Sequence, residues 1–335
     1  MGEPVTAYPR PGDRLAVVDQ SGSTITLLDA VDHRVRAVLP VPAEPHELCF
    51  DPAHRLLYCT SAYHHGHYDE NDGRNHQVTV IDPDAGEIVD VLDISPEHGP
   101  HGMALDACRG MLYVSVEAGP AGPGGVVVLD TATRKVLRRV DTEAPGPHWF
   151  VTDPDGVHGY AANKEAPFVS VVDLTSGELV AKVAVPGSEG IAAGPDGSVV
   201  AVAAPKADGR SAAQPGVRLI DTRTAKVVRT LPTEFPVVPV HWTDTGLLLV
   251  GELLDGAGRL SVWTGTSPVS VELVGQADVG AFPLTIRSSP DGTLVYVAAV
   301  FGSTVTVLDV GNPARPTVLD TLEIPHAHGL AYIPA

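Results

Sequence analysis

Short apolar runs alternate with turn residues along the chain and build a repeating unit. One copy reads PHGMALDACRGMLYVSVEA over Pro100–Ala118 and, after a loop, GGVVVLDTATRKVLRRVD over Gly124–Asp141; another copy spans Pro147–Val185. Each copy contains an apolar strand, a turn, a second strand, a loop, a third strand, a turn and a fourth strand. Apolar runs of this length bounded by Gly, Pro and Asp predict β-strands. The pattern therefore predicts a chain made of four-stranded units.

The unit recurs at the spacing of β-propeller blades. Its first strands begin near His46, His101, His148, Glu189, Val238, Leu284 and His328, which are separated by 55, 47, 41, 49, 46 and 44 residues. Four strands in a repeat of this length are typical of a propeller. The chain starts with a second-strand pattern at Arg14–Gln20 and ends with a first-strand pattern at His328–Pro334. We therefore predict one all-β domain over residues 1–335, a seven-bladed β-propeller with four antiparallel strands per blade and blade one closed by both termini.

Six third strands are predicted to end in an aspartate that begins a turn. These residues are Asp29, Asp82, Asp130, Asp173, Asp221 and Asp309. An aspartate at the first position of a type I turn accepts hydrogen bonds from the turn backbone, which gives these residues a structural role. Blade six has Thr264 at this position.

Charge and cysteine content narrow the functions to consider. The formal net charge is −19 and Lys and Arg form no run, so a nucleic acid or an anionic membrane surface is not expected as a partner. The three cysteines form no C-x-x-C pair, which argues against a disulfide framework. The sequence has no leader-like start and no apolar stretch of about 20 residues. We expect a soluble cytoplasmic protein, and the sequence leaves its oligomeric state open.

Several strand motifs resemble a known repeat family. LLYCTSA at Leu56–Ala62, MLYVSVE at Met111–Glu117 and LVYVAAV at Leu294–Val300, with TVTVLD at Thr304–Asp309, resemble the second and third strands of YVTN-family β-propellers. The resemblance extends over nearly the whole chain and implies the propeller fold. Similar propellers include lactonases, a streptogramin lyase, metal-dependent oxygenases and non-enzymatic binding proteins, so the resemblance leaves the function open.

One position of the repeat is rich in histidine. From blade one to blade seven, the residue that starts the first strand is His328, His46, His101, His148, Glu189, Val238 and Leu284. First strands line the channel of a propeller, so we expect the four imidazoles to converge near its top mouth. Imidazole binds Fe, Cu, Zn and Ni, and we predict one transition-metal ion, with iron first. Glu189 is predicted as a further ligand or as an acceptor that orients an imidazole.

The alternative is that these histidines are structural. A Pro-His-Gly sequence suits the start of a strand, and each imidazole would then bond to a backbone carbonyl. This alternative explains one or two histidines better than four in the same repeat position.

The top face also offers candidates for proton transfer. A long loop of blade two, residues 63–77, contains His65 and His67, and long loops in compact domains are often functional. Glu117 ends the second strand of blade three and is the third candidate. The alternative for each is a solvated side chain.

These observations favour a metal-dependent enzyme that acts on a small organic molecule at the top mouth. Oxidative, oxygenase-type chemistry is slightly favoured over a metal-assisted lyase, because ligation by imidazole alone suits a redox metal. In ligand type and ring position the site is similar to the four-histidine iron propellers, the carotenoid-cleavage oxygenases. A non-catalytic propeller that binds a metal or a ligand is the alternative, and a closed coordination sphere would favour it. A lactonase-like hydrolase comes third, since Glu189 is the one carboxylate expected on the axis.

Overall fold

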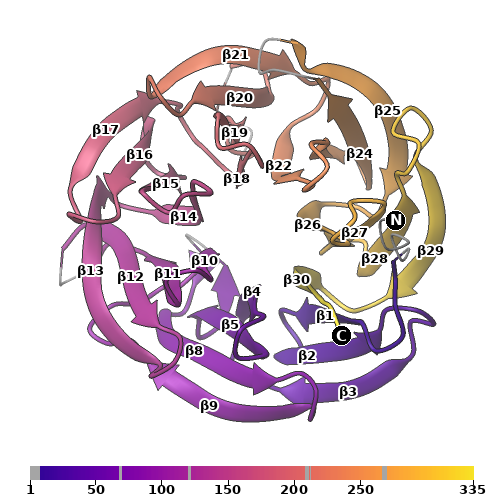
Figure 1. Ribbon diagram of the computed structural model, residues 1–335, viewed down its shortest axis with the longest axis horizontal. Helices are drawn as coiled ribbons and strands as arrows, with labels where there is room; N and C mark the ends of the chain where they lie inside the picture. Colours follow the sequence, from indigo (N-terminus) through magenta and orange to yellow (C-terminus); the bar gives the residue numbers. More distant parts are fainter. Residues whose placement is uncertain (1–7, 68–69, 120–121, 208–210, 212, 266–269) are drawn as a thin grey trace, which may run out of the picture.

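The chain folds into a ring of β-sheets around a central channel (Figure 1). The structure is a computed structural model that describes residues 8–67, 70–119, 122–207, 211, 213–265 and 270–335. Within these residues, 28 strands form seven four-stranded antiparallel sheets, which confirms the predicted seven-bladed propeller. No helix in the described part of the chain is long and apolar enough to cross a membrane.

Blade one combines strands from both ends of the chain, and blades two and three follow it in sequence order. From the channel outward, blade one consists of β30 (Ala327–Ile333), β1 (Arg14–Asp19), β2 (Thr24–Asp29) and β3 (Val35–Pro40). Blade two consists of β4 (Pro45–Asp51), β5 (Leu56–Tyr63), β8 (Arg74–Asp82) and β9 (Glu87–Asp93). Blade three consists of β10 (Met103–Asp106), β11 (Met111–Val116), β12 (Gly124–Asp130) and β13 (Lys135–Ala144).

The remaining four blades follow one another in sequence order. Blade four consists of β14 (Pro147–Thr152), β15 (His158–Asn163), β16 (Phe168–Asp173) and β17 (Leu179–Ala184). Blade five consists of β18 (Ile191–Ala193), β19 (Val199–Ala204), β20 (Gly216–Asp221) and β21 (Lys226–Pro232). Blade six consists of β22 (Val237–Trp242), β23 (Leu248–Leu254), β24 (Ala257–Thr264) and β25 (Glu272–Val279). Blade seven consists of β26 (Pro283–Ser288), β27 (Leu294–Ala299), β28 (Thr304–Asp309) and β29 (Thr317–Glu323).

The core lies between neighbouring blades. The middle strands are buried on both faces, so β1 and β2 each contain four consecutive buried residues, whereas the outer strand β3 is largely exposed. Leu27 of blade one and Leu57 of blade two belong to the same buried cluster. Strands covered on both faces become continuously apolar, which explains the runs in the sequence.

The predicted aspartate turns are present in the structure. Each of the six third strands with a predicted aspartate ends at that residue. Backbone N–H groups two or three residues further on donate to the carboxylates, for example Val31 to Asp29 at 2.9 Å and Gly311 to Asp309 at 2.7 Å. The turn hydrogen bonds hold the pKa of the Asp173 carboxyl below its usual value.

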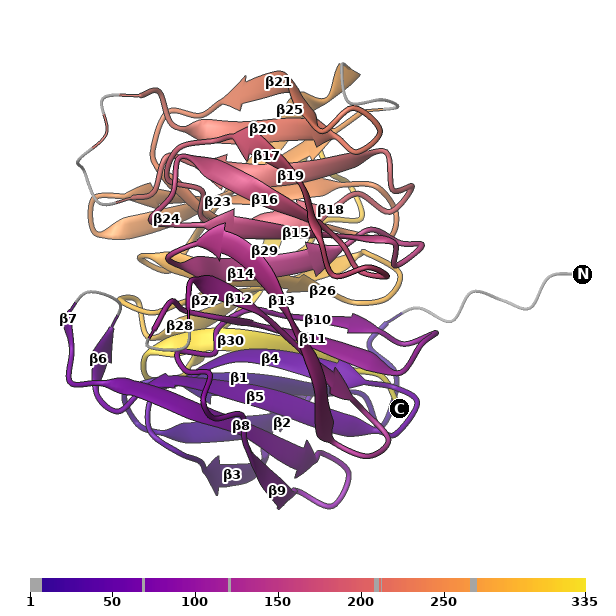
Figure 2. The same ribbon diagram turned by 90° about the vertical axis from the view of Figure 1, so that its left-hand side faces the viewer.

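Blade one closes the ring by pairing the two ends of the chain. Strand β30 pairs antiparallel with β1, with Arg14 opposite Ile333. The Tyr332 hydroxyl donates to Asp13 Oδ2 at 2.5 Å, and the Ala335 N–H donates to Asp13 Oδ1 at 2.8 Å. Edge-on, the chain end at Ala335 lies on the bottom face, and a hairpin of β6 (Gly66–His67) and β7 (Glu70–Asn71) extends from the opposite, top face (Figure 2). The predicted loop 63–77 contains this hairpin and overlaps the end of β5 and the start of β8.

Candidate metal centre

Four imidazoles from four neighbouring blades stand together at the top of the channel. His46, His148 and His328 are the second residues of β4, β14 and β30, and His101 comes two residues before β10. The rings of His46 and His328 have centroids 4.1 Å apart, those of His46 and His101 4.6 Å, and those of His101 and His148 4.2 Å. All four side chains are at most 5% exposed. The repeat position therefore corresponds to one compact cluster in space.

The cluster offers two overlapping sets of metal-ligand atoms. One ligand atom from each of His46, His101 and His148 lies within 4.8 Å of the others, and the same holds for His46, Glu47 and His328. Both sets include His46, so the two groups of ligand atoms adjoin each other. Imidazole nitrogen and carboxylate oxygen are ordinary ligands of Fe, Zn and Cu.

Burial keeps the four imidazoles neutral at physiological pH. Loss of hydration lowers the pKa of His328 to about 3 and holds the pKa values of His46 and His148 well below 6.5. Burial also lowers the pKa of His101, although the Glu117 carboxylate opposes this shift. A neutral imidazole keeps a lone pair, which is the form that binds a metal ion.

Several buried polar atoms of the cluster have no hydrogen-bond partner in the described part of the chain. These atoms are His46 Nδ1, His328 Nδ1 and Glu47 Oε1. Buried polar groups are nearly always paired, so an unpaired set at one place indicates a bound ion or water. The residues present therefore fit a metal ion, which would occupy these lone pairs.

Second-strand hydroxyls fix the backbone on which the histidines stand. The Thr60 hydroxyl donates to the carbonyl oxygen of His101 at 2.9 Å, and the Ser115 hydroxyl donates to that of His148 at 2.6 Å. Each bond joins one blade to the next. The imidazole positions thus depend on the packing of whole blades.

Glycines allow the first strands of neighbouring blades to approach closely. A Cβ at Gly329 would lie 2.3 Å from the carbonyl oxygen of His46, and one at Gly102 would lie 2.8 Å from that of His148. The Gly102 N–H donates to this same His148 oxygen at 2.9 Å. Only glycine, which has no side chain, therefore fits at the positions that directly follow His328 and His101.

A polar group behind His101 sets the orientation of its ring. His101 Nδ1 lies 2.8 Å from the Gly99 carbonyl oxygen and must donate to it, which leaves Nε2 as the acceptor or ligand atom. The Tyr63 hydroxyl lies 3.1 Å from Nε2 and 2.7 Å from Glu117 Oε1, and Arg74 Nε donates to the other Glu117 oxygen. Donation from Tyr63 to Glu117 leaves the lone pair of Nε2 for a metal.

The structure places Glu117 in this supporting position, with Oε1 3.9 Å from His101 Nε2. Glu117 is not one of the described residues that line the cavity at the top mouth of the channel. Its predicted part in proton transfer stays a prediction, and the geometry favours a role in positioning His101.

Glu47 is a site residue that the sequence pattern did not single out. It is 3% exposed, and its Oε1 lies 3.6 Å from His328 Nδ1. Burial raises the pKa of Glu47 to about 7, with Arg287 and the Trp149 indole opposing the shift. One feature of the sequence could have identified it: Glu47 directly follows His46, whereas glycine follows the equivalent histidines of blades one and three.

Glu189 is buried near the cluster but has its own partners. It is 3% exposed, its Oε2 lies 3.5 Å from Lys164 Nζ, and its Oε1 accepts from the Ala207 N–H at 3.3 Å. Burial raises the pKa of Glu189 and Lys164 opposes this shift. It belongs to neither set of ligand atoms, so its predicted role as ligand or orienting acceptor stays a prediction.

A cavity of about 450 Å³ opens above the histidines at the top mouth. Its polar wall includes His46, His148, His328, Lys164 and Glu189. Its apolar wall includes Val238, Phe282, Leu284, Val300 and Phe301. The two repeat positions that carry apolar residues thus face the cavity, and an amphipathic small molecule matches its two walls.

The histidines of the blade-two loop lie at the rim of this mouth. His65 lines the cavity with a side chain that is 79% exposed, and its Nδ1 lies 3.6 Å from Glu44 Oε1. The side chain of His67 lies outside the described residues. Catalytic roles for both stay predictions.

Fold and site together define the class: a seven-bladed β-propeller with a buried four-histidine cluster at the top of its channel. No protein-family model matches the chain. It is a distant homologue of YncE, an uncharacterized protein of Salmonella typhi, with 26% identity over 225 residues. The match covers 63% of this chain and 57% of YncE, so the chain spans little more than half of its relative.

Solved structures agree on the fold. A functionally unknown protein from Desulfotomaculum acetoxidans has a TM-score of 0.76 at 11% identity and covers 96% of this chain and 99% of its own. A Bacteroides fragilis protein with a provisional 6-phosphogluconolactonase assignment has a TM-score of 0.72 at 12% identity, over 98% of this chain and 100% of its own. At these identities the likeness supports the propeller alone, and the metal and the reaction must be argued from the site.

Proposed function

We propose that the four histidines bind one transition-metal ion and that the protein is a metal-dependent enzyme for a small organic molecule. One observation carries the proposal: four neutral, buried imidazoles from four blades meet directly beneath a cavity of about 450 Å³. A cavity with convergent polar groups is the usual form of an active site.

The apolar and polar walls of the cavity would have different roles at this site. Phe282 and Leu284 would hold the apolar part of the substrate and exclude water from that side of the mouth. Lys164 and Glu189, which lie 3.5 Å apart on the polar wall, would donate and accept hydrogen bonds at its polar end. The bound metal would supply a redox centre or a Lewis acid.

Iron is the first candidate for the metal, with copper, zinc or nickel as alternatives. Four neutral imidazoles leave the positive charge of the ion uncompensated, and this donor set suits a redox metal. The buried Glu47 carboxylate beside His328 would offset part of that charge. Oxygenase-type chemistry is therefore proposed ahead of a metal-assisted lyase.

Elemental analysis of tag-free protein tests the metal directly. About one equivalent of iron or another transition metal per chain is expected. The His101→Ala variant should lose most of it while keeping the wild-type circular dichroism spectrum. His158→Ala is the matched control, because this half-exposed histidine pairs with Asp153 at a turn and should leave the metal content unchanged. A protein that contains no metal and takes up none on titration would contradict the proposal.

A non-catalytic binding propeller is the second candidate, and the burial of the histidine cluster favours it. All four histidines are at most 5% exposed, and Glu47 adds a fifth donor. A coordination sphere filled by protein ligands would serve binding only. Azide added to the metal-loaded protein distinguishes the two: a new charge-transfer absorption band indicates an open position and supports an enzyme, whereas an unchanged spectrum supports the binding protein.

A further inference from the structure

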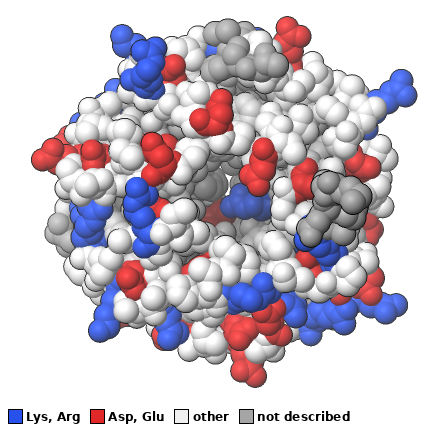
Figure 3. Space-filling model, in the orientation of Figure 1, with Lys and Arg blue, Asp and Glu red and all other residues white. Residues whose placement is uncertain are grey.

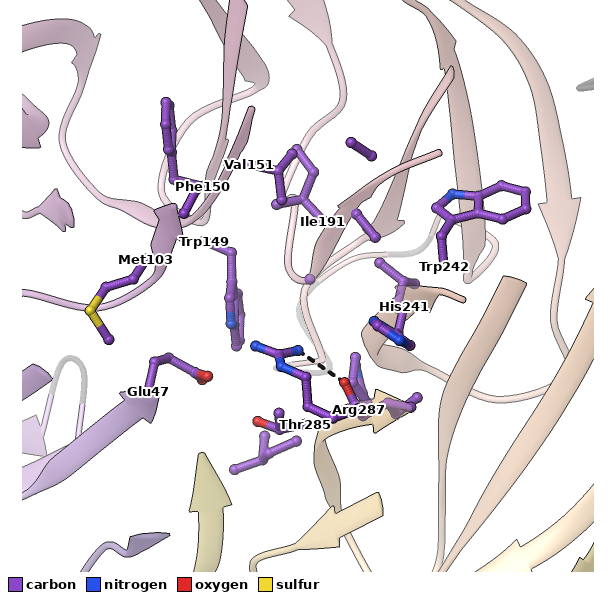
Figure 4. A pocket seen from close by; sticks show the side chains of 18 of the residues that line it. Glu47, Met103, Trp149, Phe150, Val151, Ile191, His241, Trp242, Thr285 and Arg287 are labelled. Atoms are coloured by element: carbon purple, nitrogen blue, oxygen red, sulfur yellow. Dashed lines mark hydrogen bonds between the residues drawn. The ribbon is translucent and has the colours of Figure 1, made fainter. Parts of the chain in front are cut away.

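A second cavity, the lower chamber, lies further down the channel from the histidine cluster. It has a volume of about 320 Å³ and is lined by first-strand residues that follow the histidine position of the repeat, among them Trp149, Ile191, Trp242 and Arg287 (Figure 4). Glu47 borders it as well. The mouth cavity and the lower chamber share few residues, so the chamber is a separate space.

Arg287 brings a positive charge into this chamber. It is the penultimate residue of β26, and its Nη1 donates to the carbonyl oxygen of Ile286 at 2.9 Å. Among the described residues, no carboxylate forms an ion pair with its guanidinium, although the chain has 41 acidic residues. It is also the one Lys or Arg among the described residues that line the chamber. Figure 3 shows basic and acidic side chains next to each other in the central opening of the face in view.

Two further donors line the same space without a partner. Thr285 Oγ1 and Trp242 Nε1 are buried and have no hydrogen-bond partner among the described residues. The Thr285 side chain is 4% exposed. Buried donors without an acceptor cost free energy unless a ligand or water accepts from them. Together with the guanidinium, they form a set of donors suited to an anion.

The charge of this donor set comes from Arg287 alone. His241 also lines the chamber, and its Nε2 lies 2.9 Å from Ser288 Oγ. Burial, with Arg287 contributing, lowers the pKa of His241 to about 3, so this imidazole is neutral. One cation therefore matches one negative charge, and the Glu47 carboxyl at the chamber wall disfavours a second.

We propose that the lower chamber binds a small organic monocarboxylate, with its carboxylate on Arg287 and its apolar body against Trp149 and Ile191. The planar fork of a guanidinium matches a carboxylate through two parallel hydrogen bonds. Met103 and Val240 add further apolar side chains to the walls. This site does not use the four histidines, although Glu47, one of the candidate metal ligands, also borders the chamber.

Titration with benzoate, followed by tryptophan fluorescence, tests this site. Trp149 and Trp242 line the chamber, so binding should change the emission in a saturable way. Arg287→Gln should weaken benzoate at least tenfold, because the charged hydrogen bonds are lost. The neutral analogue benzamide should bind the wild-type protein at least tenfold more weakly than benzoate. Arg34→Gln is the matched control, since the Arg34 side chain is 81% exposed, and it should bind as the wild type does.

Three outcomes would overturn the proposal: no saturable change, equal affinity in Arg287→Gln, or equal affinity for benzamide. If Arg287→Gln unfolds, Thr285→Val removes one donor at nearly constant volume and should still weaken benzoate severalfold. The Arg287→Gln variant should still bind the metal, because it keeps the four histidines and Glu47, although Arg287 also lowers the pKa of Glu47. Failure of this proposal and failure of the metal proposal are thus distinguished.

Discussion

At the scale of single residues, burial gives the histidine cluster its chemistry. An exposed imidazole is half protonated near pH 6.5, whereas the buried His328 has a pKa of about 3. Among the described residues, His46 Nδ1, His328 Nδ1 and Glu47 Oε1 have no hydrogen-bond partner, and the last two atoms lie 3.6 Å apart, so all three could serve as metal ligands. Glu47 is the strongest candidate for the carboxylate that completes the site.

Glu47→Gln should lower metal affinity roughly 10- to 100-fold, because a neutral amide neither compensates the ion's charge nor orients His328. The measurement is competition with a chelator of known affinity. Glu189→Gln is the matched comparison, since Glu189 is equally buried but paired with Lys164. A larger loss for Glu189→Gln than for Glu47→Gln would assign the carboxylate to Glu189.

At the scale of elements, irregular strand starts bring the ligand atoms together. The register of β4 against β5 shifts between Pro45 and Leu48, and that of β14 against β15 shifts between Pro147 and Trp149. At such a bulge, consecutive side chains no longer point to opposite faces. His46 and Glu47 can therefore both contribute to one set of ligand atoms.

The metal-free protein should lose stability as the pH falls below 6.5. The unfolded chain takes up a proton on His328 near pH 6.5, whereas the folded chain does so near pH 3. Between these values the unfolded state binds more protons, so the free energy of unfolding is fully present above pH 6.5 and falls as the pH approaches 3. The slope for this histidine is on the order of 1 kcal/mol per pH unit.

Urea unfolding at several pH values measures this slope. His328→Gln should reduce it, because glutamine does not titrate. An equal slope in the variant between pH 6.5 and 4.5 would show that His328 does not contribute.

At the scale of the whole molecule, the ring depends on the contact between its two chain ends. Asp13 is fully buried and accepts hydrogen bonds from the Arg10 N–H, the Tyr332 hydroxyl and the Ala335 N–H. Strand β30 carries His328, so ring closure and the histidine cluster share one strand. Weakening the contact between the two chain ends should therefore also disturb the histidine cluster at the top of the channel.

Asp13→Ala should lower the free energy of unfolding by about 2–4 kcal/mol, because three hydrogen bonds are lost and the buried Tyr332 hydroxyl is left without its acceptor. The midpoint of thermal unfolding measures the effect. Asp32→Ala, at an exposed turn position, is the control and should change stability little. An Asp13→Ala variant as stable as the wild type would show that pairing of β30 with β1 closes the ring without these side-chain contacts.

The sequence by itself determined the repeat, the seven blades, the aspartate turns and the column of four histidines. These features depend on residues close together in the chain: apolar runs, turn residues and a repeat that places equivalent residues at equivalent points of the ring. The repeat also assigned Val238 and Leu284 to the channel, and both line the mouth cavity.

Only the tertiary structure decided which side chains meet across blades. Glu47 lies beside His328 from another blade, Glu117 supports His101 through Tyr63, and Arg287 faces the lower chamber. Strand alternation could not predict these contacts, because bulges interrupt it at the strand starts and because distances between blades are set by packing around the whole ring.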